Sequence, residues 1–152
     1  MGQKWLRDDK KNLKYGRVVI LLQGRFAGKK AVIVKSSEDG TKDRKFGHVL
    51  VAGVERSPKK VTKRMGSKKI QKRTSVKPFI KYVNLNHIMP TRYSVKELCD
   101  FKELVKEDKI KNNNKSEVRD SLKKVFVEKY RAINPEEKSA SHTRFFFSKL
   151  RF

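Results

Sequence analysis

The chain has 152 residues, of which 40 are Lys or Arg and 16 are Asp or Glu, so its formal net charge is +24. So much positive charge on a chain of about one domain's length repels itself and favours a large anionic partner, nucleic acid first. The single cysteine, Cys99, excludes an internal disulfide framework and a cysteine-rich zinc site. The longest aliphatic run, 18–22, is far too short to span a membrane.

The first third of the chain predicts β-strands. Apolar, β-branched runs fill 18–22 and 31–34, and a basic segment with glycines joins them, which indicates a β-hairpin. Both runs are continuous rather than alternating, as expected for strands covered on both faces or curled into a small barrel. Further strands are predicted at 49–54 and 79–85.

The connection between the first two strands is a candidate phosphate site. We expect Arg25, Lys29 and Lys30 to project from it toward phosphates. Gly28 would supply a backbone conformation or a close approach that a Cβ would block. Phe26 would either cap the barrel or stack on a base. The whole segment has the layout of a KOW motif; the alternative is an ordinary hairpin with a solvated basic loop.

Residues 56–96 contain 13 basic and no acidic residues, more than half of the net charge, and we call this segment the acid-free tract. Solvated surfaces normally mix both signs, so the tract indicates a polyanion partner. Within it, residues 56–78 are predicted to form a basic arm. Part of 59–73 could be a helix or a strand edge, but we expect a loop that is ordered only against its partner. The arm's cations also fit a nuclear or nucleolar signal.

The end of the tract offers a second candidate. His87, Arg92 and Tyr93 could stack on unpaired RNA bases. The alternative is a structured loop that packs Ile88 and Met89 on the core.

The final third predicts a helix at 115–131, since its apolar residues fall on one face of a 3.6-residue period. Asn114 and Glu117 resemble a capping box at its start, and Asn134-Pro135 should stop it. Residues 109–115 are expected to be a linker.

The tail 143–152 holds four Phe among basic residues and should not remain exposed to water. It could occupy a nucleic-acid or protein groove, or it could return onto the chain's own core.

Catalysis finds little support. His48, His87 and His142 are far apart in sequence and match no metal or triad spacing. The glycine-bearing loop lacks the spacing and the Ser or Thr of a phosphate-binding Walker loop. We therefore predict a protein that is not an enzyme and has no cofactor of its own, apart from Mg ions shared with RNA.

Five segments, 18–34, 47–56, 78–81, 86–93 and 146–152, together resemble one family in colinear order. It is the eukaryotic cytosolic large-subunit ribosomal protein twenty-seven, distinct from the bacterial family of that number. The resemblance implies a mainly β, α+β fold: an SH3-like KOW barrel with a long basic arm, a C-terminal amphipathic helix and an aromatic-basic tail. It also implies a structural, non-catalytic role in the 60S subunit.

The resemblance divides the chain into an extension at 1–14, a barrel at 15–96 carrying the arm 56–78, and a C-terminal extension at 97–152. Residues 3–13 make the start longer than is usual in the family, and 97–113 and 135–143 diverge, so contacts are not carried over there.

The implied partners are large-subunit ribosomal RNA and neighbouring large-subunit proteins. No membrane, small-molecule substrate or homo-oligomer is expected. The expected location is the cytoplasmic ribosome, with nuclear or nucleolar passage during assembly. The RNA contacts implied by the resemblance are Arg25, Lys29, Lys30, Arg56, Lys59, Lys60, Lys63, Lys68, Lys69, Lys72, Arg73 and Arg92. The residue patterns add Arg64, Lys77, His87, Tyr93, Arg144, Lys149 and Arg151.

Two other classes of protein remain open as alternatives. One is a KOW module of transcription elongation or RNA processing, acting outside the ribosome. The other is a basic protein that packs DNA or binds a membrane surface, although such proteins rarely carry a strand-rich domain with this loop.

Overall fold

The computed structural model describes residues 13–96, 98, 100–105, 110, 114–133 and 140–151. Most of the predicted N-terminal extension, Cys99, most of the predicted linker, the Asn134-Pro135 stop signal and Phe152 lie outside the described residues.

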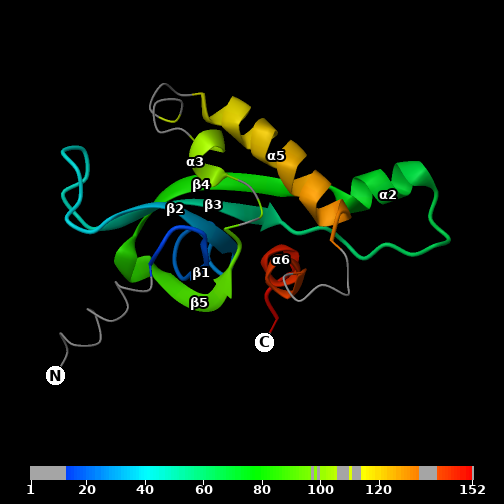
Figure 1. Cartoon of the computed structure of the whole chain (residues 1–152), viewed down its shortest axis with the longest axis horizontal. Helices are drawn as coiled ribbons and strands as arrows, with labels where there is room; N and C mark the ends of the chain where they lie inside the picture. The colour runs from blue at the N-terminus through cyan, green and yellow to red at the C-terminus, as the bar shows by residue number, and fades with distance from the viewer. Residues whose placement is uncertain are drawn as a thin grey trace.

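Five strands form one antiparallel sheet in the order β4-β3-β2-β1-β5 (Figure 1). The strands are β1 (Arg17–Leu21), β2 (Lys30–Ser37), β3 (His48–Arg56), β4 (Lys77–Asn84) and β5 (Ile88–Ser94). The strands predicted from the apolar runs are confirmed. The structured loop given as the alternative for the segment with Ile88 and Met89 is not observed, because β5 runs through that segment as an edge strand, the position in a sheet that tolerates Pro90.

The sheet curls because its two edge strands are neighbours in sequence. β4 and β5 are joined only by η1, a single turn of 3-10 helix (Leu85–His87). In a flat sheet the edges would lie about 19 Å apart, and three residues of 3-10 helix advance only about 6 Å. The Leu85 N–H donates to the Gly47 carbonyl (3.1 Å), and the Leu22 N–H donates to the His87 carbonyl (2.9 Å). η1 therefore joins the end of β1 to the start of β3.

The curled sheet remains open. Among the described residues no ladder joins β4 to β5, and register shifts interrupt the β1–β5, β2–β3 and β3–β4 pairs. Such bulges bend strands locally. The predicted α+β class is confirmed, whereas closure into a barrel is not observed.

Both faces of the sheet are buried, which explains the continuous apolar runs. One face forms an inner core to which all five strands contribute, for example through Leu21, Ile33, Val51, Phe79 and Ile88. Alternate strand residues form the outer core together with the helices. The expectation of strands covered on both faces is confirmed.

Three helices of the C-terminal third cover the outer face (Figure 1): α3 (Phe101–Leu104), α5 (Lys115–Arg131) and α6 (Ala140–Phe147). α5 has the range that its apolar period predicts, and it buries Val118, Leu122 and Phe126. The predicted capping box is wrong, because the Asn114 side chain makes no capping hydrogen bond.

The aromatic tail returns onto the chain's own core. Phe146 and Phe147 on α6 are fully buried, and their rings meet the Phe126 ring edge-to-face with centroids 5.5 and 5.7 Å apart. Edge-to-face aromatic pairs stabilise a fold beyond what the burial of their apolar surface contributes. Of the two alternatives for the tail, the structure therefore has the return onto the core.

The arm contains a helix, α2 (Ser67–Thr74), so the expected loop is wrong over these residues. The Lys59 N–H donates to the Arg73 carbonyl (2.8 Å), which ties the segment before α2 to its last turn. The Arg131 guanidinium on α5 donates to the Thr74 hydroxyl (3.3 Å). These contacts fold the arm back toward the body of the protein.

Lys30 is buried rather than projecting toward solvent, so its predicted position is wrong. Its ammonium donates to the carbonyls of Phe145 (2.7 Å) and Ser148 (2.9 Å) and to the Ser148 hydroxyl (2.8 Å). These acceptors lie at the C-terminus of α6, where carbonyls lack helical partners and the dipole is negative. β2 thus holds α6 against the sheet through one lysine, and burial lowers the pKa of Lys30 to about 8.

The requirement for glycine at position 28 should come from its backbone conformation alone. Its φ is +72°, and a Cβ added there would meet nothing within 4 Å. Gly28→Ala should lower the free energy of unfolding by about 1–2 kcal/mol, and Gly28→Val should lower it further, since β-branched residues tolerate positive φ least. Urea unfolding of both variants measures this. Gly28→Asn, which tolerates this conformation, should lose least, and equal stability of the Val variant would contradict the assignment.

Lys30 should make stability depend on pH. Its pKa is about 8 in the folded protein against an ordinary value of 10.5, so between these values the unfolded chain binds more protons. Stability from this group should therefore rise as pH increases from about 8 to 10. The difference in unfolding free energy between the wild type and Lys30→Met, measured in urea at several pH values, isolates this contribution. A difference that stays constant over this range would contradict it.

Candidate nucleic-acid interface

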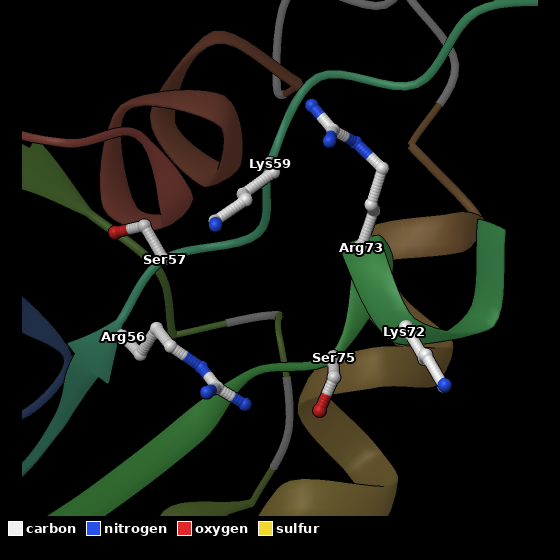
Figure 2. A pocket seen from close by; sticks show the side chains of 6 residues that line it. All are labelled: Arg56, Ser57, Lys59, Lys72, Arg73 and Ser75. Atoms are coloured by element: carbon white, nitrogen blue, oxygen red, sulfur yellow. The ribbon is translucent and has the colours of Figure 1, made fainter. Parts of the chain in front are cut away.

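A hollow of about 400 Å³ lies at the base of the arm, where β3 ends and α2 returns to the sheet (Figure 2). Its lining combines four cationic residues with two hydroxyls: Arg56, Ser57, Lys59, Lys72, Arg73 and Ser75. We call it the basic hollow.

Backbone contacts shape the basic hollow. Besides the bond from the Lys59 N–H to the Arg73 carbonyl, the Arg73 Nε donates to the Lys60 carbonyl (2.8 Å). These two bonds hold residues 57–60 against the last turn of α2. Lys72 and Arg73 lie in that last turn, where the negative end of the helix dipole favours cations.

The basic hollow is built to attract an anion. Its lining contains no Asp or Glu, and its ammonium, guanidinium and hydroxyl groups are the donors that proteins use for phosphate. The nearby carboxylate of Glu55 is taken by Lys77, 3.0 Å away in a partly exposed ion pair. Lys77, a predicted RNA contact, is therefore already paired within the chain, although exposed pairs of this kind are weak.

The arm beyond the hollow presents further cations. Figure 1 shows α2 and the chain that leads to it extending past one end of the sheet. Five predicted contacts are exposed there: Lys60, Lys63, Arg64, Lys68 and Lys69. Helix and hollow together bring most of the predicted arm contacts into one region.

Some residues of the hairpin loop reach solvent, and one is buried in the core. Arg25 is exposed and Lys29 is half-buried, so both can reach solvent. Phe26 is buried, and its ring stacks on Phe79 with centroids 4.1 Å apart. Of the two roles expected for Phe26, the structure has the capping of the inner core.

The second candidate, formed by His87, Arg92 and Tyr93, makes contacts within the chain. The Tyr93 ring stacks on Phe145 (3.9 Å between centroids), and the Arg92 guanidinium donates to the Tyr93 hydroxyl (3.1 Å). His87 is half-buried in η1, and Ile88 is buried while Met89 is exposed. One face of the Tyr93 ring is therefore not free to stack on a base.

The C-terminal cations lie at the surface. Arg144 is exposed on α6, and Lys149 and Arg151 are exposed after it.

Sequence reasoning missed Ser57 and Ser75, which join the arm's cations only because α2 folds back to β3. No motif in the sequence marks them.

The described residues offer neither a metal site nor a membrane-spanning helix. No cluster of three or more His, Cys, Asp or Glu there could hold a metal ion. Among the helices in the described part of the chain, none combines the length and the apolar character needed to cross a membrane.

Known proteins match nearly the whole chain. Residues 18–152 match the Ribosomal L27e protein family. The large ribosomal subunit protein eL27 of Tetrahymena thermophila is 96% identical over 142 residues, 93% of this chain and 99% of the relative. The proteins eL27B of Saccharomyces cerevisiae and eL27 of Solanum tuberosum are 46% and 49% identical; each match covers 93% of this chain and 98% or 99% of the relative. The resemblance read from the sequence is thus confirmed, and the chain belongs to the ribosomal L27e protein family.

Proposed function

We propose that this chain is a structural constituent of the cytosolic large ribosomal subunit and binds large-subunit ribosomal RNA. Family membership supports the ribosomal part of the proposal. The observation that carries RNA binding is the acid-free tract, with 13 cations and no carboxylate over residues 56–96. Its arm exposes most of its cations to solvent and gathers four cationic residues at one hollow.

The mechanism is electrostatic and architectural. The inner and outer cores fix the point at which the arm leaves the sheet. The arm neutralises phosphates of RNA segments that crowd together. Arg25 and Lys29 on the hairpin loop would add contacts from a second direction. Lys30 is omitted from the proposed contacts, because its ammonium is buried against α6.

The proposal includes the architecture of the sheet and the surroundings of the protein. The curled sheet is proposed to be an SH3-like KOW core, supported by the positive φ of Gly28 and by the short η1 connection between the edge strands. Residues 1–14 and 97–152 would be extensions of that core. The protein would act as a single copy beside neighbouring large-subunit proteins, sharing Mg ions with the RNA and passing through the nucleolus during assembly.

The proposed role requires no catalysis. The hydroxyls of Ser57 and Ser75 in the basic hollow are surrounded by Lys and Arg, and the lining holds no His or carboxylate that could activate them as nucleophiles. Binding and positioning are therefore the chemistry that this lining supports.

Charge removal on the arm should change the salt dependence of RNA binding. Replacing Lys63, Arg64, Lys68 and Lys69 by Gln removes four exposed cations and should flatten the log–log salt slope for ribosomal RNA by about 3 units. The slope is measured from dissociation constants of the full chain at several salt concentrations.

A matched control removes the same charge from α5. Lys115, Lys123, Lys124 and Lys129 are also exposed, and their replacement by Gln should leave the slope nearly unchanged. Equal flattening in both variants would mean that the net charge, not the arm, binds RNA.

Sedimentation tests the ribosomal role directly. A tagged chain that stays out of large-subunit particles at moderate salt would refute that role and favour a role outside the ribosome.

A further inference from the structure

The basic hollow differs in kind from the rest of the arm. Most of its cations are as exposed as those farther along the arm, but the hollow brings together donors from two stretches of chain, 56–59 at the end of β3 and 72–75 at the end of α2. Every residue lining this hollow carries a cation or a hydroxyl.

The side chains approach the hollow from different sides. Figure 2 shows the Arg56 guanidinium extending from the end of β3 toward Ser75, and the Lys59 ammonium extending toward Ser57. The Arg73 guanidinium turns back to the 57–60 segment, in agreement with its bond to the Lys60 carbonyl (2.8 Å). Lys72 points away from the other three and remains free to meet a neighbouring part of the same ligand.

We propose that the basic hollow seats one backbone phosphate of the bound RNA, and that this phosphate fixes the arm relative to the sheet. The inference rests on the proposed function and specifies one of its contacts. A phosphate there would accept from Arg56 and Lys59 on the stretch that ends β3, and from the Ser75 hydroxyl that follows α2. It would thereby join the stretches 56–59 and 72–75, whose cations otherwise repel each other.

The structure contains a reporter for this role. The Lys59 N–H is hydrogen-bonded to the Arg73 carbonyl (2.8 Å), across the boundary between the 57–60 segment and α2. Opening of the arm at its base breaks this bond and exposes the amide to exchange. A phosphate that fixes the arm should slow that exchange.

The experiment uses the full chain with a single-stranded oligoribonucleotide and, separately, with pyrophosphate at the same ionic strength. In the wild type, RNA should slow hydrogen exchange of the Lys59 amide about tenfold or more and shift the amide resonances of Ser57 and Ser75. The double variant Arg56→Gln/Lys59→Gln should lose that protection and bind RNA about tenfold more weakly, as expected for loss of charge-assisted hydrogen bonds.

The control variant Arg64→Gln/Lys68→Gln removes one Arg and one Lys from exposed positions of the same tract. It should keep the protection at Lys59 and lose less affinity. If both pairs lose affinity equally and RNA leaves the Lys59 amide unprotected, the hollow is no separate site, while the proposed function stands. If the wild type binds no RNA at all, the proposed function fails.

The two probes separate the sources of phosphate. Protection by RNA at concentrations where pyrophosphate gives none supports a seat for a backbone phosphate. Protection by pyrophosphate without protection by RNA overturns it, because the site then takes a free anion. Should the Arg56→Gln/Lys59→Gln variant fail to fold, the wild-type exchange data decide, since unchanged exchange at Lys59 with bound RNA also overturns the inference.

Discussion

Burial of both faces of the curled sheet is the constraint on which the rest of the structure depends. The inner core takes side chains from all five strands, and the outer core takes the alternate ones together with α3, α5 and α6. A sheet buried on both sides leaves the covered part of its central strands little surface on which to carry charge. Most basic residues in the described part of the chain therefore lie on loops, helix surfaces, the arm and the ends or edges of the sheet, whereas Lys30 is buried and its ammonium has three oxygen acceptors.

That displacement explains where the protein can meet a polyanion. An arm free of carboxylates would repel itself along its length, and the structure limits this by anchoring its base at three points: the Glu55–Lys77 ion pair, the Lys59–Arg73 backbone bond and the Arg131–Thr74 bond to α5. The anchors bring the cations of α2 to one place beyond the sheet, which the proposed phosphate would fix further. Preorganised cations bind with a smaller loss of conformational entropy than those of an unfolded arm.

Sequence alone predicts the parts of this fold that depend on apolar pattern. The runs at 18–22 and 31–34 predict β1 and β2, and the 3.6-residue period predicts α5. Of the two roles expected for Gly28, a special backbone conformation or a close approach, the structure has the first, with φ at +72°. β5 escapes prediction because Pro90 and Thr91 interrupt its apolar character, and only its place at the sheet edge makes it a strand. α2 escapes because its stabilising contacts come from α5 and from the segment before it, which no local pattern records.

The candidate site shows the same limit, because residue type does not decide the fate of a cation. Lys30 stands beside Lys29 in sequence, yet as the first residue of β2 it is buried in the core, where the C-terminal carbonyls of α6 supply its acceptors. Arg56 is the last residue of β3, and no carboxylate lines the hollow that it enters. A buried ammonium with three oxygen partners needs no further ligand, whereas cations gathered around a hollow without an acidic partner gain most from an anion that arrives from outside. The difference between the two lies in the acceptors that tertiary structure brings to each.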